Sequence, residues 1–177
     1  GAGECDVAAD RERLEKRHGL PRSAILFNVS HIHSGPLSWV PENLSHDVEA
    51  AAVEATAAYI VELEKTIEAV ADRALAGLAD RRPAALSWSL GVAPFVMNRR
   101  VFTERGVAFG VNPKGPVDRS VLVIRVQDAD GGLRAIVMGV ACHCTCASSA
   151  NVSIDGDYAG HAQADLETRF PGAKVLF

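Results

Sequence analysis

The chain has 177 residues, of which 48% are hydrophobic and 23% charged, so it is long enough to bury a core and is most simply one domain or a large part of one. Its net charge is -4 and its 18 Lys and Arg residues are scattered, a distribution that excludes a nucleic-acid-binding surface. No apolar run approaches the roughly 20 residues that span a bilayer, and no signal-like segment opens the chain.

The first predicted elements are a charged helix and a strand. Residues 10–19 predict a helix that ends at Gly19. The apolar run over residues 24–31 predicts a buried strand. Because side chains two apart share one face of a strand, we expect His31 and His33 to emerge together at its carboxyl end. Such a pair is explained equally well by hydrogen bonds to the loop, so it indicates a metal or catalytic site only together with other residues.

A long helix follows over residues 45–78. Ser45 offers an N-cap, and Asp47 and Glu49 put negative charge in the first turn. Apolar side chains recur along one face at steps of three and four residues: Val48, Ala52, Ala55, Tyr59, Leu63, Ile67, Val70 and Ala74.

The second half of the chain predicts a sheet and a further helix. Residues 84–92 alternate as in a strand, and residues 98–100 follow in a loop. Two β-rich runs around a connector rich in Asp and Gly predict a hairpin over residues 121–140. A short helix is expected over residues 158–169, with a last strand beginning within residues 171–177. These elements predict an α/β fold, a mixed sheet with flanking helices.

Three of the four cysteines surround a histidine, as Cys142, His143, Cys144 and Cys146. If the preceding strand continues its alternation, the cysteines lie on one face and His143 on the other, so they cannot share a metal ion. Structural zinc also takes a second ligand pair, which Cys5 alone cannot supply. We therefore expect the cysteines to be small buried apolar residues.

Polar side chains after predicted strands carry the candidate chemistry. His31 and His143 are candidate ligands of one zinc ion, since zinc ligands often come from separate strands, but catalytic zinc normally takes a third protein ligand. Arg99 is a candidate for holding an anionic or carbonyl oxygen, although a loop arginine is usually solvated. Asp155 and Asp157 are carboxylate candidates, although Asp beside Gly is more often a turn former.

Five motifs occur in one order along the chain. They are His31-Ile32-His33-Ser34-Gly35-Pro36, Asn98-Arg99, Asn112-Pro113-Lys114-Gly115-Pro116-Val117-Asp118, Ala141-Cys142-His143-Cys144-Thr145 and Gly156-Asp157-Tyr158-Ala159-Gly160-His161-Ala162. In order and approximate spacing they resemble the motifs of the neutral/alkaline, non-lysosomal ceramidases. The resemblance spans residues 10–177 and implies that residues 1–177 are a partial N-terminal catalytic domain, truncated at both ends.

The resemblance implies a zinc-dependent amidohydrolase that cleaves the N-acyl bond of ceramide or a similar lipid. His31 and His143 would bind Zn²⁺, His33 would face the substrate amide as a catalytic group, and Arg99 would position the substrate. The family's remaining ligands, a Glu and a Tyr, are expected outside this sequence. Zinc would act as a Lewis acid and would lower the pKa of bound water to about 7.

The chain departs from the family's pattern in two motifs. The resemblance implies a nucleophilic Ser at the position of Gly156, so we expect zinc-bound water to attack instead. Tyr158 and His161 replace an Asn and a Tyr, and Cys144 replaces a Pro. The alternative function is a non-catalytic binding relative that retains the fold. The family likeness further implies secretion or association with a membrane surface.

Overall fold

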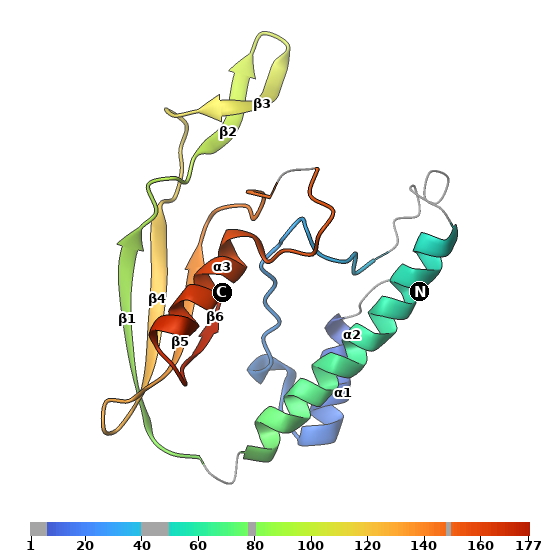
Figure 1. The fold of residues 1–177 in the computed structure, drawn as a ribbon, viewed down its shortest axis with the longest axis vertical. Helices are drawn as coiled ribbons and strands as arrows, with labels where there is room; N and C mark the ends of the chain where they lie inside the picture. The colour runs from blue at the N-terminus through green and yellow to red at the C-terminus, as the bar shows by residue number, and fades with distance from the viewer. Residues whose placement is uncertain (1–6, 40–49, 78–80, 148–149) are drawn as a thin grey trace. The chain divides into compact units, whose positions relative to one another are not determined.

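The structure is a computed structural model, and it describes residues 7–39, 50–77, 81–147 and 150–177. Its helices are α1 (Val7–His18), the 3-10 turn η1 (Arg22–Ala24), α2 (Ala50–Ala76) and α3 (Asp157–Arg169). Its strands are β1 (Ala84–Val92), β2 (Asn98–Thr103), β3 (Gly106–Asn112), β4 (Ser120–Asp128), β5 (Leu133–Val140) and β6 (Lys174–Leu176) (Figure 1). The predicted α/β class is confirmed.

The chain divides into two compact units. One contains Gly1–Val29 and Gly35–Arg81, and the other contains Ser30–Ser34 and Arg82–Phe177. Among the described residues, no helix combines the length and apolar character needed to cross a membrane.

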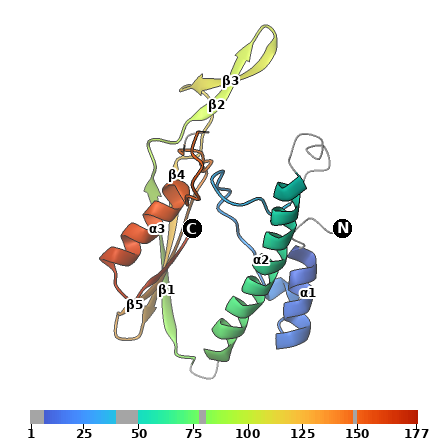
Figure 2. The ribbon, with the colours of Figure 1, turned by 45° about the vertical axis from the view of Figure 1, so that its right-hand side comes forward.

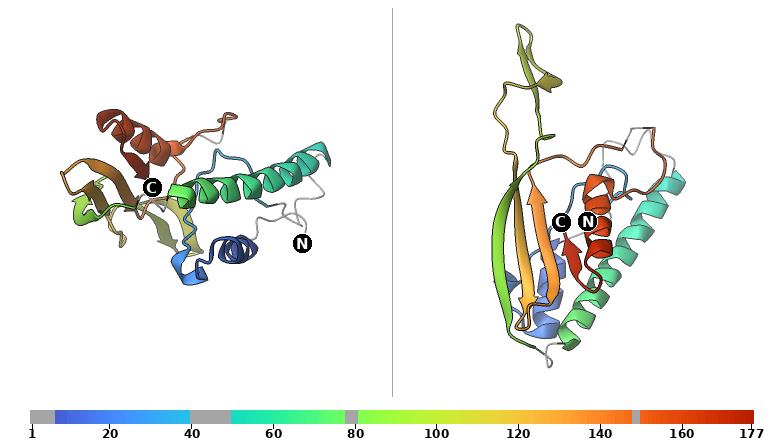
Figure 3. Two further views of the ribbon diagram at one scale, coloured as in Figure 1. Left: turned by 90° about the horizontal axis from the view of Figure 1, so that it is seen from below. Right: turned by 60° about the vertical axis from the view of Figure 1, so that its left-hand side comes forward.

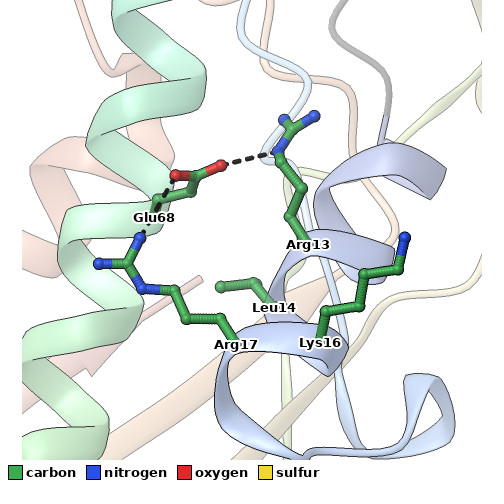
Figure 4. Close-up of a pocket in the computed structure, with 5 residues that line it drawn as sticks. All are labelled: Arg13, Leu14, Lys16, Arg17 and Glu68. Atoms are coloured by element: carbon green, nitrogen blue, oxygen red, sulfur yellow. Dashed lines mark ion pairs between the residues drawn. The ribbon is translucent and has the colours of Figure 1, made fainter.

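In the first unit, α1 packs on α2 through a buried leucine and a row of ion pairs. Leu14 is buried, and Glu68 of α2 lies 2.7 Å from Arg13 Nε and 3.8 Å from Arg17 Nη1 (Figure 4). The helix ends as predicted: Gly19 has a φ of 66°, and its N–H donates to the carbonyl of Glu15.

The predicted long helix is confirmed over its described part, whereas Ser45, Val48, Asp47 and Glu49 lie outside the described residues. The apolar face predicted from the helical spacing does not coincide with the buried part of α2. Ile60, which is outside that face, is the buried residue of α2, and Tyr59 and Val70 are 36% and 49% exposed. Helical spacing identifies which apolar side chains share a face of the helix. Which of them lose contact with water depends on the elements that pack against the helix.

The predicted strand over residues 24–31 is wrong. Residues 22–24 form η1, and the chain then has no regular structure until Ile32 makes one parallel bridge with Cys144. Leu26 and Val29 are 86% and 79% exposed. An apolar run becomes a strand only where its backbone pairs with a neighbouring strand, and the structure forms no strand over residues 25–31.

The second unit is built on a sheet of order β1-β4-β5-β6, in which only the β5–β6 pair is parallel. The predicted strand at residues 84–92 and the hairpin at residues 121–140 are confirmed as β1 and β4–β5. The predicted helix is confirmed as α3, which lies beside β6 (Figure 2), where the Gln163 side chain donates to the carbonyl of Val175 at 2.9 Å.

A second, two-stranded sheet joins β1 to β4 (Figure 3). It corrects the predicted loop over residues 98–100, because Asn98 and both arginines belong to β2. Phe102 pairs with Val107, and the register shifts between Asn98 and Arg100. The polar residues at the start of β2 carry no strand signal in the sequence. Pairing with the alternating segment of β3 stabilises the strand.

Candidate metal site

Three histidines of the second unit form a cluster, named here the histidine cluster: His31, His33 and His143. Each offers a ring nitrogen, and these atoms all lie within 4.8 Å of one another. The ring centroids are 4.4 to 5.0 Å apart, and His33 Nε2 lies 2.7 Å from His143 Nε2. Within the described ranges, no other group of three His, Cys, Asp or Glu side chains converges in this way.

The single bridge between Ile32 and Cys144 explains why the three imidazoles meet. Paired residues of neighbouring strands point to the same side, and their sequence neighbours point to the other. Cys144 is fully buried and Ile32 half-buried, whereas all three histidines are exposed. The bridge therefore places the histidine cluster on the solvent side of the contact.

His31 adopts a left-handed backbone conformation, with a φ of 55°. This region is uncommon for residues other than glycine, although His occurs there more often than most, and such outliers persist where the surroundings impose them. The strand expected to present His31 and His33 is thus absent, but both side chains still face the same side. The bridge between Ile32 and Cys144 and the left-handed backbone of His31 therefore bring the two side chains together in place of the predicted strand.

The loop that carries His143, residues 141–147, is named here the histidine loop. It is not an extension of β5, as the alternation argument assumed. The Cys142 N–H donates to the carbonyl of Val140 at 2.8 Å, and the Thr145 N–H donates to the carbonyl of His143 at 3.0 Å, so the chain turns twice.

Turning of the histidine loop gives its cysteines different surroundings. Cys144 is buried, Cys142 is half-buried and Cys146 is exposed, and all three thiols are free. Among the described cysteines, the expectation of buried apolar residues therefore holds for Cys144 alone, and Cys5 lies outside the described residues. No cysteine among the described residues joins the metal-binding group.

The residues before and at the start of α3 hold the histidine loop, a role that sequence reasoning missed. The Tyr158 hydroxyl donates to the carbonyl of Cys142 at 2.5 Å, and the Asp157 carboxylate accepts the Ala147 N–H at 2.9 Å. The Asp155 N–H donates to the carbonyl of Ser34 at 2.9 Å. The sequence signal that could have pointed to this role is a Tyr at the start of a predicted helix, one of the two tyrosines in the chain.

Asp155 and Asp157 act as turn formers, as the more frequent role of Asp beside Gly predicts. The Asp155 carboxylate accepts the Asp157 N–H at 2.6 Å. Asp157 is only 2% exposed; burial favours its neutral form, but hydrogen bonds from Ala147 and Tyr158 outweigh burial and lower its pKa. Loss of water contact and the nearby Asp157 raise the pKa of Cys146, so that this thiol stays protonated.

The chemistry of the histidine cluster fits zinc. Partial loss of water contact lowers the pKa of His143, and the imidazoles of His31 and His33 lower it further. Neutral imidazole is the form that binds a metal ion. Tetrahedral zinc at about 2.0–2.1 Å from each nitrogen separates two ligand atoms by about 3.3 Å. The 2.7 Å contact between His33 and His143 is a hydrogen bond instead, so these nitrogens would move apart by about 0.6 Å if both bound zinc.

Arg99 lies on β2, where its guanidinium carbon is 4.4 Å from the centroid of the Phe109 ring. This stacking is a cation–π contact on the face of β3. No contact between Arg99 and the histidine cluster occurs among the residues described. Its role in binding substrate stays a prediction.

Gly156 has a packing reason to lack a side chain. A Cβ at this position would lie 2.9 Å from the Cα of Gly160, and the Gly160 N–H donates to the carbonyl of Gly156 at 2.8 Å. The first turn of α3 therefore leaves no room for a serine unless the backbone shifts.

Comparison with models of known protein families gives no match, and comparison with curated proteins gives none either. Among solved structures, neutral ceramidase from Pseudomonas aeruginosa matches with a TM-score of 0.61 and 18% identity, over 99% of this chain and 28% of that chain. A ceramidase complexed with C2 matches with a TM-score of 0.59 and 20% identity, over 96% of this chain and 26% of that one. The chain thus spans little more than a quarter of these ceramidases, and the predicted likeness in fold is confirmed.

Proposed function

We propose that this chain forms part of a zinc-dependent amidohydrolase that cleaves the N-acyl bond of a ceramide-like lipid. The observation that supports this proposal is the histidine cluster, in which one ring nitrogen from each of the three histidines lies within 4.8 Å of the others. The cluster occurs on a chain with the fold of neutral ceramidases. The five ordered motifs support the same reaction class.

The proposed roles differ among the residues of the site. His31 and His143 hold Zn²⁺, and His33 donates a hydrogen bond to the negative charge that develops on the amide oxygen. Arg99 positions the substrate. Zinc, when bound, supplies a Lewis acid for the amide carbonyl and lowers the pKa of water. The proposed nucleophile is water, and Gly156 has no side chain that could take this role.

Zinc affinity tests the metal site most directly. We expect the chain to bind Zn²⁺ in competition with a chromophoric chelator, and His31→Ala and His143→Ala to weaken binding at least about tenfold each. His18→Ala is the matched control, because this histidine pairs with Asp72 in the other unit and lies outside the histidine cluster. Equal affinity in all four proteins would refute the site.

Hydrolysis is tested separately on the full-length protein that contains this chain, with a fluorescent short-chain N-acyl sphingosine. We expect turnover that a chelator abolishes and added zinc restores. An active metal-free protein would contradict the proposal.

A non-catalytic binding relative is the second candidate function. The observation that favours it is that the described part of the histidine cluster includes no carboxylate that could act as a general base. Retained zinc and retained lipid binding, without turnover of any amide or ester, would identify this function.

A further inference from the structure

We infer that Tyr158 is a positioning residue of the metal site, which fixes His143 through the backbone carbonyl of Cys142. The inference rests on the proposed metal site, and it concerns a residue at which the chain departs from the family's motif. Its basis is a set of contacts between the start of α3 and both segments that carry the histidine cluster.

The packing of the Tyr158 ring sets the place of its hydroxyl. The ring meets Phe95 edge-on at a centroid distance of 5.9 Å, and Phe177 at 5.6 Å with an interplanar angle of 84°. Aromatic contacts on two sides restrict the ring to one rotamer. The hydroxyl is therefore held in place before it donates to Cys142.

The hydrogen bond acts on the peptide group next to His143. Tyr158 Oη lies 2.5 Å from the carbonyl oxygen of Cys142, and that carbonyl belongs to the peptide bond that joins Cys142 to His143. Fixing the plane of this peptide limits the direction in which the His143 side chain leaves the backbone. On the other side, the bridge between Ile32 and Cys144 fixes the following residue, so His143 is held from both neighbours.

The neighbours of Tyr158 extend this restraint to the whole site. Asp157, which is 2% exposed and has a φ of 53°, holds the end of the histidine loop through the Ala147 N–H. Asp155 holds the other histidine-bearing segment through the carbonyl of Ser34. Residues 155–158 thus contact both segments, and Tyr158 binds the carbonyl of the peptide group that precedes His143.

The test is the substitution Tyr158→Phe, which keeps the ring and removes the hydroxyl. We expect Zn²⁺ to bind about tenfold more weakly, the loss typical of a group that orients a metal ligand. We also expect the visible absorption spectrum of the Co²⁺-loaded protein to change in intensity, because the geometry at the metal changes.

Two matched controls separate positioning from general stability. Tyr59→Phe removes the hydroxyl of the chain's other tyrosine, on α2 in the other unit. Gln163→Ala removes a hydrogen bond of the same helix, to Val175 of β6, without a contact to the histidine loop. We expect both controls to bind zinc and cobalt like the unmodified chain. The same loss of affinity in Gln163→Ala as in Tyr158→Phe would overturn the inference.

A measurement without metal distinguishes failure of this inference from failure of the proposed function. We expect the ring signals of His143 in nuclear magnetic resonance spectra of the metal-free chain to shift in Tyr158→Phe and to stay unchanged in Gln163→Ala. Unchanged His143 signals in Tyr158→Phe would overturn the positioning role. A lack of zinc binding in the unmodified chain would overturn the proposed function. The shifts of the His143 signals would still test whether Tyr158 positions His143.

Discussion

Ile32 and Cys144 pair through one parallel β-bridge, and this contact determines which side chains form the candidate metal site. The pair lies with its own side chains inward, so His31, His33 and His143 lie outward beside one another. The bridge joins residues that are 112 positions apart (144 minus 32). A site that depends on one backbone contact makes specific predictions about its two partners and their neighbours.

Cys144→Ser places a hydroxyl where the thiol is fully buried. We expect a loss of about 1–3 kcal/mol in the free energy of unfolding, because a hydroxyl loses more hydration than a thiol when it is buried, and weaker zinc binding with it. Urea denaturation followed by circular dichroism measures the first effect. Cys146→Ser is the control, since Cys146 is exposed and a serine can still donate to Asp157, and an equal loss there would argue against a special role for Cys144.

His33→Ala separates a catalytic role from a ligand role. If His33 stabilises charge on the substrate, hydrolysis falls by about 10²-fold or more while zinc affinity stays within a few-fold of the unmodified chain. We expect this outcome, since the His33 nitrogen is placed to hydrogen-bond rather than to share zinc with His143. Loss of zinc as large as in His31→Ala would instead make His33 a ligand.

Zinc affinity is expected to fall as the pH is lowered from 7 to 5. Protonation of an imidazole, whose ordinary pKa is about 6.5, competes with metal binding. The lowered pKa of His143 keeps this ring neutral, and so able to bind zinc, to a lower pH than an ordinary imidazole. Chelator competition across this range is the measurement, and an affinity that does not change with pH would argue against histidine ligands.

Asp157 makes a pH-dependent contribution to stability. Its pKa is lowered in the folded chain, so it contributes stability that is fully present above the ordinary Asp pKa and is lost as the pH falls through the folded value. We therefore expect Asp157→Asn to destabilise the chain at pH 7 and to have a smaller effect under strongly acidic conditions. Thermal unfolding at several pH values tests this, with Asp165→Asn as a control on the exposed side of the same helix.

Gly156→Ser tests the close approach at the start of α3. The new Cβ would lie 2.9 Å from the Cα of Gly160, so we expect a loss of about 1–3 kcal/mol in stability. Gly139→Ser is the matched control, because a Cβ there has no neighbour within 4 Å. A variant at position 156 that is as stable as the control would show that the helix start can relax.

Periodicity and turn chemistry predicted the local elements well. The strand at β1, the hairpin of β4 and β5, and the helix α3 follow from alternation, from the Asp- and Gly-rich connector and from helix-ending signals. These signals act between residues near each other in the chain. The strand predicted at residues 24–31 was wrong because a strand there needs a partner from elsewhere in the chain, and the loop predicted over residues 98–100 was wrong because these residues belong to β2, which pairs with the neighbouring β3.

The sequence by itself identified His31 and His143 as candidate zinc ligands and His33 as a candidate catalytic group, because imidazole can bind a metal ion and can donate or accept a proton. Only the tertiary structure decided that all three meet, through a left-handed His31 and the contact of Ile32 with Cys144. Only the tertiary structure showed that Tyr158 holds the histidine loop. A hydrogen bond between residues far apart in the chain produces no periodic pattern in the sequence. Residue types therefore predict the chemistry of the site, and the folded backbone decides the geometry of the site.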